Sequence, residues 1–292
     1  MPRLVVVALG GNAIAPPTRR LDIGAERVAV RTAVEEIAGV LTADGRALIV
    51  HGNGPQVGRL LGDPGDLDVH VAQTQGELGY LLAQALDAVT NAAGSAAVVT
   101  RVAVDPADPA FAHPAKPIGP VLDTPAGEGP LVRTPDGRGW RRVVPSPRPV
   151  AIVELEAIRA LLATHHVVAG GGGGIPVEAG ARAGRGRPAV VDKDWVAALL
   201  GIALEAAELL FVTDVSCAFE RFATAGAQPI RAMTVARARA LLADGVFAPG
   251  SMAPKVESAV QFVEATARRA VIAGLGEIRA ALEGLAGTTV RP

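Results

Sequence analysis

The 292-residue sequence has little cysteine, few aromatic side chains and little net charge. Its single cysteine, Cys217, excludes an internal disulfide framework and is typical of a reducing compartment. A formal net charge of −1 gives no electrostatic basis for binding nucleic acid or an anionic membrane. No apolar run approaches the ~20 residues that span a bilayer. We therefore expect a soluble, cytoplasmic protein that acts on small molecules, with neither nucleic acid nor membrane as its partner.

Lysine is also scarce. Three lysines, Lys116, Lys193 and Lys255, stand among 28 basic residues. A lysine ammonium is a compact point charge, whereas an arginine guanidinium is a planar fork, so a site that places one cation among phosphate oxygens can require lysine. The alternative is three ordinary surface lysines, since most lysines are exposed.

Short apolar runs alternate with helical patterns along the chain. Strands are expected at 4–9, 47–50, 96–104, 167–169, 208–213 and 270–273, and helices at 25–41, 69–92, 154–163, 193–204, 235–242, 253–266 and 277–285. The first run could be misread as a short signal peptide, but only one positive residue precedes it. This alternation predicts βαβ units, and therefore an α/β fold with a mostly parallel sheet covered on both faces.

Residues 105–149 differ from the rest because they are rich in proline, glycine and charge. Long unstructured loops are uncommon in compact domains. We therefore interpret 105–149 as a small subdomain or a mobile lid, inserted within a single domain that spans residues 1–292.

Three glycine clusters, LGGNA, HGNGPQVG and AGGGGGIPV, follow predicted strands. Ligands of parallel sheets bind beyond the carboxyl ends of the strands, and glycine lets backbone N–H groups approach phosphate. The clusters thus predict an anion-binding rim, with ordinary turns as the alternative. The patterns G-x-x-x-x-G-K-[ST] and G-x-G-x-x-G are absent. The adjacent His165 and His166 are interpreted as solvated or capping side chains, and no metal site is predicted.

The positions of the lysines favour phosphoryl transfer, which needs positioned positive charge rather than covalent help. Lys193 opens a predicted helix whose N-cap would be Asp192, and helix N-termini favour anions. Asp194 is interpreted as a carboxylate that holds lysine ammoniums, although an ordinary first-turn acid is equally common. Lys255 lies in the first turn of another helix, and Lys116 lies in the insert, where a lid would bring it over the site.

The motif set resembles that of the carbamate kinases of the amino acid kinase superfamily, and it runs through nearly the whole chain. The motifs occur in the family's order: LGGNA, HGNGPQVG, TQGELGY, DPADPAF, KPIGP, AGGGGGIPV, VDKD and FAPGSMAPKVESAVQFVE. The resemblance implies a three-layer α/β/α sandwich with a small protruding subdomain, assembled as a homodimer. It also implies reversible phosphoryl transfer between ATP and carbamate, giving ADP and carbamoyl phosphate, in the service of arginine catabolism. Mg²⁺ is expected with the nucleotide.

The same resemblance assigns the site residues by motif. Catalytic roles fall to Lys116, Lys193, Asp194 and Lys255. Carbamate and phosphate binding falls to Gly10, Gly11, Asn12, Gly52, Asn53, Gly54, Gly172 and Gly173, and nucleotide binding to Asp214, Val215, Met252 and Pro254. Cys217 is interpreted as a buried bystander.

Three other functions remain open at this stage. A sister kinase of the same fold would phosphorylate another small acid or phosphate, although the KPIGP insert argues against it. A nucleotide-binding sensor without catalysis would have no need of the four catalytic residues. A dinucleotide oxidoreductase is the most distant alternative, because its fingerprint is missing.

Overall fold

The computed structural model of the chain describes residues 3–14, 22–42, 44–60, 67–90, 94–125, 129–134, 137, 139–180, 184–222 and 224–292. The helices in this part are α1 (Gly11–Ile14), α2 (Ile23–Ala38), α3 (Gly54–Leu60), α4 (Leu67–Val89), α5 (Leu155–Leu162), α6 (Lys193–Ala203), α7 (Val235–Ala243), α8 (Met252–Thr266) and α9 (Ile278–Leu282), with 3₁₀ turns η2 (Pro109–Phe111) and η3 (Gly171–Gly173).

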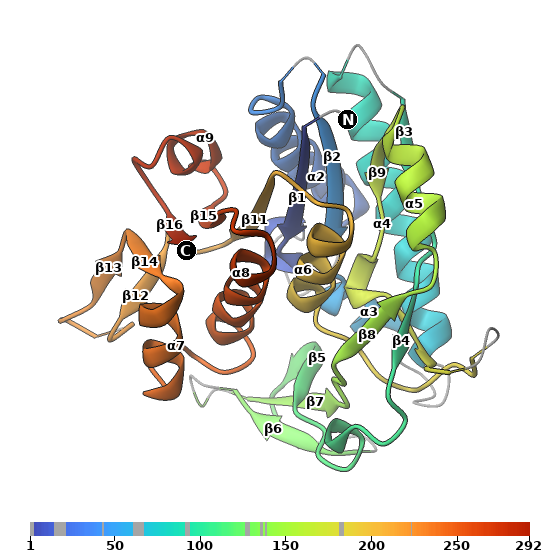
Figure 1. Cartoon of the computed structure of the whole chain (residues 1–292). Coiled ribbons are helices and arrows are strands. Elements are labelled where there is room, and N and C mark those ends of the chain that lie inside the picture. Colours follow the sequence, from blue (N-terminus) through green and yellow to red (C-terminus); the bar gives the residue numbers. More distant parts are fainter. Residues whose placement is uncertain are drawn as a thin grey trace.

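An eight-stranded sheet forms the centre of the molecule (Figure 1). Its order is β14 (Ala232–Thr234), β16 (Thr288–Arg291), β15 (Ala270–Gly274), β11 (Glu208–Thr213), β1 (Leu4–Leu9), β2 (Arg46–His51), β9 (His166–Val168) and β3 (Ser95–Ala97). Every neighbouring pair is parallel except β15 and β16. The predicted α/β fold with a mostly parallel sheet is therefore confirmed.

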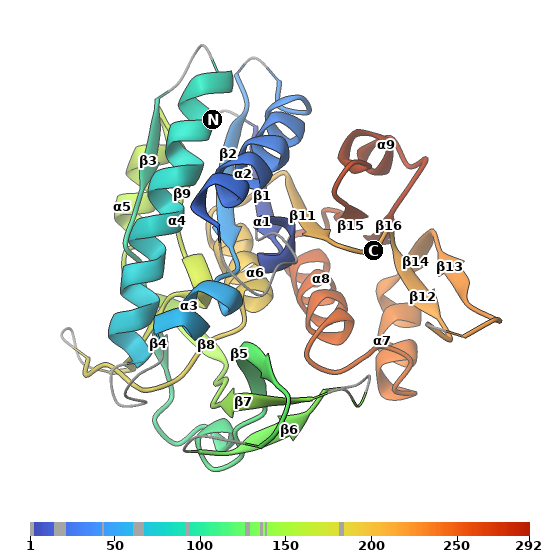
Figure 2. The same cartoon turned by 180° about the vertical axis from the view of Figure 1, so that it is seen from behind.

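Helices cover both faces of this sheet, which gives three layers. Side chains alternate along β1, so Val6 and Ala8 join the apolar cluster that includes α5, α6 and α8, whereas Val5 and Val7 join the cluster that includes α2, α4 and α9. Figure 2 shows α2 and α4 on the rear face, opposite α5 and α6. Strands buried on both faces explain why the sequence runs are apolar throughout.

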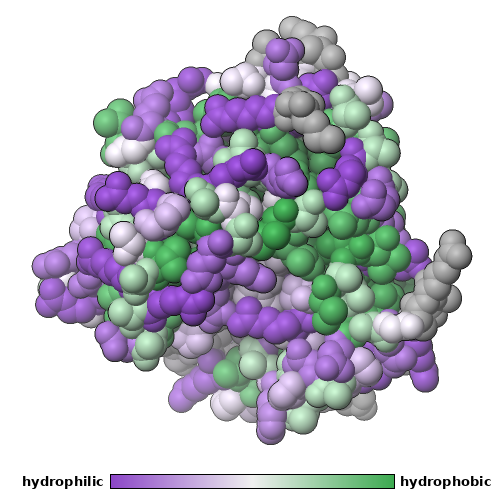
Figure 3. All heavy atoms as spheres, viewed as in Figure 1, coloured by the Kyte–Doolittle hydropathy of each residue, from purple (hydrophilic) through white to green (hydrophobic). Residues whose placement is uncertain are grey.

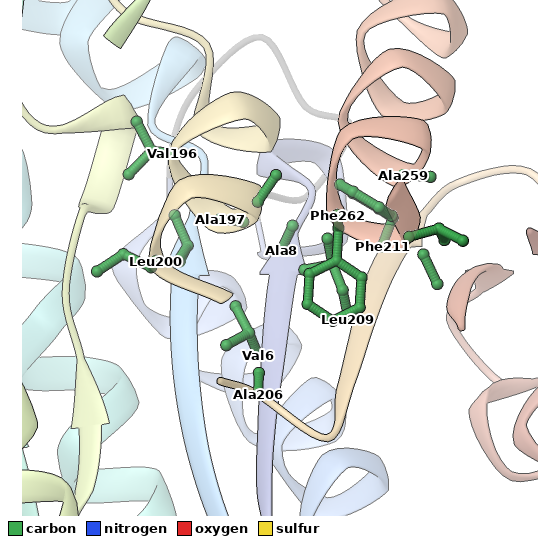
Figure 4. Close-up of a cluster of buried hydrophobic side chains, with 14 of the residues drawn as sticks. Val6, Ala8, Val196, Ala197, Leu200, Ala206, Leu209, Phe211, Ala259 and Phe262 are labelled. Atoms are coloured by element: carbon green, nitrogen blue, oxygen red, sulfur yellow. The ribbon is translucent and has the colours of Figure 1, made fainter. Parts of the chain in front are cut away.

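Helices α6 and α8 pack side by side on the sheet (Figure 4). The ring of Phe262 fills the space beside Gly201, where a Cβ would lie 3.1 Å from it. Phe211 and Leu209 of β11 complete this cluster, and burial of one such phenylalanine stabilises the fold by roughly 1.5–3 kcal/mol. The packing fixes the starts of α6 and α8 next to each other, and these starts carry Lys193 and Lys255.

The insert at 105–149 folds around a three-stranded antiparallel sheet, β5 (Lys116–Leu122), β7 (Trp140–Val144) and β6 (Leu131–Arg133). A second small sheet, β10 (Ile175–Glu178), β4 (Arg101–Val104) and β8 (Pro149–Ile152), lies at its base. The insert approaches α3 closely, because a Cβ on Gly58 would lie 2.1 Å from the Cα of Gly119. Its backbone thus contacts the helix that follows the second glycine turn.

Several sequence predictions are wrong in detail. The strand expected at 96–104 is two strands, β3 and β4, in different sheets, and residues 98–100 separate them. The buried Thr100 there donates its main-chain N–H to a side chain, Gln75 Oε1, at 2.7 Å. The last helix is shorter than 277–285, and α3, β10, β14, β16 and the hairpin β12 (Ala218–Glu220) with β13 (Gln228–Ile230) were not predicted. Within the described residues, no helix is long and apolar enough to cross a membrane.

The surface of the molecule is mostly hydrophilic on the face that carries α5, α6 and α8 (Figure 3). Hydrophobic residues gather on this face where Figure 1 places α5, α6 and β8. Val150 and Val153, on and after β8, are among the exposed large apolar side chains.

Candidate active site

The carboxyl edge of the central sheet carries two helix starts that face the same space. Asp192 caps α6, since its Oδ1 accepts a hydrogen bond from the N–H of Asp194 at 3.0 Å. The cap sets the first turn of α6, so that the side chains of Lys193 and Asp194 project from this turn toward the start of α8. The N-cap predicted for this helix is confirmed.

Asp194 joins two lysines. Its Oδ1 accepts from Lys193 Nζ at 2.7 Å, and its Oδ2 accepts from Lys255 Nζ at 3.0 Å. Lys255 also donates to the carbonyl of Ser251 at 3.3 Å. Asp194 is almost fully buried, so this carboxylate holds two ammoniums at a fixed separation in a low-dielectric site.

The third lysine arrives from the insert. Lys116, the first residue of β5, makes an ion pair with Asp192 Oδ2, while the other oxygen of Asp192 caps α6. A single aspartate therefore ties the insert to the helix that carries Lys193. Three lysines that are 77 and 62 residues apart along the chain meet around two adjacent aspartates.

Burial and charge act in opposite directions on these groups. Burial would raise the pKa of Asp192, but Lys116 and Lys193 hold it well below its usual range. Burial lowers the pKa of Lys193, and it outweighs the nearby carboxylate of Asp194, which raises this pKa. The ammonium of Lys255 lowers it further. Burial also opposes the charge of Lys255, yet Asp194, Asp192 and Asp214 together raise its pKa. The site thus holds three ammoniums close together, balanced by carboxylates, and a bound anion would further stabilise their charged form.

A pocket of about 440 Å³ opens over these lysines. The sequence-predicted residues that line it are Lys116, Lys193, Lys255, Gly10, Gly11, Gly52, Asn53, Gly54, Gly172, Asp214, Val215 and Met252. Asp194, Gly173 and Pro254 are outside this lining, and the side chain of Asn12 lies outside the described residues. All three lysines of the sequence and its single cysteine reach this one pocket.

Comparison with known proteins identifies the fold. Residues 3–274 match the model of the amino acid kinase family. The chain belongs to the amino acid kinase family. It is similar to the carbamate kinases of Pyrococcus furiosus, at 38% identity over 100% of both chains, and of Halobacterium salinarum, at 39% identity over 98% of both. The solved carbamate kinase of Giardia lamblia bound to AMP-PNP superposes with a TM-score of 0.87 at 34% identity, covering 99% of this chain and 98% of that one.

These relatives confirm the likeness to carbamate kinases that the motifs indicate, and this amino acid kinase is a phosphotransferase. These relatives match over 98% or more of their lengths and the family model spans residues 3–274, so the insert at 105–149 and both lysine-bearing helices fall within the matched region.

Two glycines in the turns of this amino acid kinase use their N–H groups for hydrogen bonds within the sheet. Gly10 donates its N–H to Val212 and Gly52 donates to Leu9, both at 2.9 Å, so these two glycines shape the turns rather than offer donors. Space also demands glycine here, since a Cβ on Gly52 would lie 2.8 Å from the N of Gly11. The third turn is equally tight: a Cβ on Gly173 would lie 2.0 Å from the Val191 carbonyl.

The TQGELGY motif, which lies in α4, makes hydrogen bonds to these turns. Asn53 donates from Nδ2 to Thr74 Oγ1 at 2.8 Å, and Gln75 donates from Nε2 to the carbonyls of Thr100 and Gly171 at 3.1 and 2.9 Å. Asn53 also fills the space that a Cβ on Gly172 would need. The motif is thus a buried polar network that joins the second and third glycine turns to α4.

Sequence reasoning missed the other pocket residues. Arg141 of β7 lines the pocket and donates from Nε and Nη2 to the carbonyl of Gly119 at 3.1 and 2.9 Å, and burial lowers its pKa. Three of the six phenylalanines in the chain, Phe219, Phe222 and Phe247, also line it. The scarcity of phenylalanine was a usable signal, as the scarcity of lysine was; Arg141 had none among so many arginines.

The sequence interpretations of His166 and Cys217 have different outcomes. His166 is not solvated, because it is buried in β9, where its Nδ1 accepts from the N–H of Ala47 at 3.1 Å. Burial and Arg46 lower the pKa of His166, so the neutral ring is part of the core. Cys217 is buried as expected, although it lies against the pocket.

Proposed function

We propose that this amino acid kinase transfers a phosphoryl group reversibly between ATP and carbamate, giving ADP and carbamoyl phosphate. The observation that carries the proposal is the convergence of Lys116, Lys193 and Lys255 around Asp192 and Asp194. Phosphoryl transfer gains its rate from positioning and from neutralising charge spread over the phosphoryl oxygens. The full-length carbamate kinase relatives support this choice of acceptor.

The reaction needs no proton transfer in this direction. A carbamate oxygen, already anionic, attacks the γ-phosphorus of ATP; the new P–O bond forms as the bond to the β-phosphate oxygen breaks, and that electron pair leaves with ADP. Lys193 and Lys255, fixed by Asp194, would hold the oxygens of the transferring phosphoryl group while it lies between the attacking carbamate oxygen and the leaving ADP oxygen. Their fixed position avoids reorganisation during the reaction, which is the main source of electrostatic catalysis.

The carbamate end of the pocket is formed by the first two glycine turns. Gly11 opens α1 and Gly54 opens α3, and first-turn N–H groups have no partner within their own helix. Short turns built mostly of glycine leave room for a small planar acid of four heavy atoms. The nucleotide end is apolar and aromatic, with Val215, Met252 and the three phenylalanines as the surface for a purine ring.

Mg²⁺ fits this pocket as an ion that enters with the nucleotide. Asp192 and Asp194 are engaged by lysines, and the described residues contain no group of three or more His, Cys, Asp or Glu side chains that could cage a metal. Mg²⁺ ordinarily keeps waters and binds through substrate phosphates with one or two carboxylates, and Asp214 on the pocket wall is placed to be one of them. When bound, the ion supplies further neutralisation of the phosphate charge.

The insert at 105–149 would act as a lid within a single domain. Lys116 and Arg141 both reach the pocket from it, so opening the insert would withdraw two cations at once. The contact between Gly58 and Gly119 would form when the insert closes, and it would link the insert to α3 and to the glycine turn that precedes this helix. We also propose a cytoplasmic homodimer that serves arginine catabolism. The free, buried Cys217 supports the compartment, and the apolar area around β8 supports the dimer (Figure 3). The role in arginine catabolism rests on the likeness to carbamate kinases.

The test is ATP formation from ADP and carbamoyl phosphate by the purified protein with Mg²⁺, read by luciferase. Wild type should make ATP and a Lys255→Ala variant should make little, because one ammonium of the transferring site is gone. Arg239→Ala, at an exposed ion pair on α7, is the matched control and should keep wild-type activity.

Two other results would change the assignment. Faster phosphorylation of acetate, glutamate or a small phosphate from ATP would favour the sister kinase. ATP binding without turnover on any acceptor would favour the nucleotide sensor, and no ATP from folded wild type would remove carbamate from the proposal.

A further inference from the structure

A second cavity lies at the opposite end of the central sheet. Its volume is about 500 Å³, and it opens beside the amino ends of β1 and β2, between the ends of α5 and α6. Four arginines from four separate segments form its walls, and three leucines contribute apolar surface: Arg3, Arg46, Arg159 and Arg268, with Leu4, Leu162 and Leu204. Nothing in the phosphoryl-transfer site uses these residues.

Backbone carbonyls hold three of the guanidiniums in place. Arg159 donates from Nη2 to the carbonyl of Ala203 at 2.8 Å, and Arg268 donates from Nη1 to that of Ala206 at 2.7 Å. Arg46 donates from Nη1 to the carbonyl of Gly45 at 3.1 Å. A carbonyl orients a guanidinium without cancelling its charge, and each of these contacts involves one nitrogen of a fork that has five N–H donors.

Carboxylates near the cavity leave an excess of positive charge. Arg3 pairs with Glu208 at 3.1 Å, and Arg159 lies 3.5 Å from Glu156. Among the described residues that line the cavity, Glu205 is the one acid. Capping of helix ends would explain the bonds to Ala203 and Ala206, since basic side chains commonly bind terminal carbonyls. Capping does not explain why four segments bring their arginines around one cavity with an apolar floor.

We propose that this cavity binds a small polyanion, a molecule that carries two or more phosphate or carboxylate groups on a compact apolar body. Guanidinium forks match both oxyanions bidentately, and fixed forks lose little entropy on binding. The site is separate from the kinase pocket, because the six residues of β1 lie between them and span roughly 17 Å. A ligand there would contact the amino ends of the strands whose carboxyl ends shape the kinase pocket.

Calorimetric titration with pyrophosphate tests the proposal, with citrate as a second titrant to separate phosphate from carboxylate preference. Wild type should bind two pyrophosphates per chain. Lys255→Ala should weaken one site, and Arg159→Gln/Arg268→Gln should weaken the other about tenfold or more, as loss of two charge-assisted bonds predicts. Arg237→Gln/Arg239→Gln removes the same charge from α7 and should change neither site more than about twofold.

One pyrophosphate per wild-type chain, whose binding Lys255→Ala weakens and Arg159→Gln/Arg268→Gln does not, would overturn the proposal. Equal pyrophosphate affinities in Arg159→Gln/Arg268→Gln and Arg237→Gln/Arg239→Gln would overturn it as well. If a double variant does not fold, the proposal can still be tested on wild type alone. In crystals soaked with tungstate, an anomalous peak between Arg159 and Arg268 is expected. Tungstate in the kinase pocket with none in this cavity would contradict the assignment.

Discussion

The two ends of the central sheet both gather positive charge, but they do so with different side chains. At the carboxyl end, the lysine side chains on α6 and α8 are only 12% and 11% exposed and are bound to one buried aspartate. At the amino end, arginines 51% and 38% exposed, Arg3 and Arg159, stand at the rim of an open cavity. The carboxyl end thus encloses its lysines around a buried carboxylate, with Arg141 held beside them by the Gly119 carbonyl, whereas Arg3 and Arg159 at the amino end lie near solvent.

Space explains this division at the carboxyl end. Each oxygen of Asp194 receives one ammonium, and the stem of Lys193 runs beside Gly52, where a Cβ would be in van der Waals contact with its Cδ at 3.4 Å. A planar fork at position 193 would need more room than one ammonium beside Asp194 and Lys255. At the amino end, a fork can span a carbonyl and still present N–H groups to the cavity.

The largest expected effect comes from removing the charge that holds the lysines together. Asp194→Asn should lower kcat/KM for ATP formation by about a thousandfold or more, since two buried ammoniums would lose their shared partner and repel each other. Steady-state kinetics with circular dichroism as a folding control would measure it. A loss below tenfold in folded protein would mean that Lys193 and Lys255 are positioned by something else.

A smaller effect is expected from separating the insert from the sheet. Gly58→Ala places a methyl group where the backbone of Gly119 lies, so the insert must move away from α3. Because Lys116 and Arg141 belong to the insert, kcat should fall by about ten- to a hundredfold. Ala112→Gly, in an exposed turn of the insert, is the control. Unchanged kcat in Gly58→Ala would show that docking on α3 does not position the insert's cations.

Acid should lower the stability of the folded chain through His51, which is buried at the carboxyl end of β2. Burial lowers the pKa of His51 from 6.5 to about 4, so the unfolded chain binds a proton that the folded chain refuses between these values. Stability should therefore fall as pH drops from 6.5 to 4, by about 3 kcal/mol from this residue. Urea unfolding of wild type, His51→Asn and the exposed control His113→Asn would measure it. A pH slope that His51→Asn leaves intact would contradict the assignment.

The smallest effect is expected at the amino end. Arg159→Gln removes a half-exposed cation that is held by the carbonyl of Ala203 and by an exposed ion pair with Glu156, so unfolding free energy should fall by only about 1 kcal/mol and kinase activity should stay within twofold. Thermal denaturation and the luciferase assay would test both. A large loss of activity would show that the amino end is coupled to catalysis, and the two ends would no longer be separable.

The sequence predicted those features that depend on local pattern. The apolar runs and helical spacing located most of the central strands and helices, and the N-cap at Asp192 placed Lys193 at a helix start. Scarcity pointed to the lysines, because a rare residue kept at a helix start is informative where an abundant one is not. The same logic, applied to phenylalanine, would have located the apolar wall of the pocket.

The features that depend on tertiary contacts could not be read from the sequence. The break at Thr100 is accompanied by a bond to Gln75, and the burial of His166 follows from its place inside β9; neither leaves a periodic signal. Asn53 carries a binding-loop motif, yet its side chain is used to join Thr74. The arginine cavity is assembled from four distant segments, so only the fold brings its walls together.

The central claim is that a compact ammonium, and not simply a positive charge, is required at position 193. Single-turnover ATP formation by Lys193→Arg should be slower than wild type by about a hundredfold or more, as for loss of one preorganised donor, while Arg239→Lys on the surface stays within twofold. Near-wild-type turnover by folded Lys193→Arg would contradict the claim and leave the rarity of lysine here without a catalytic meaning.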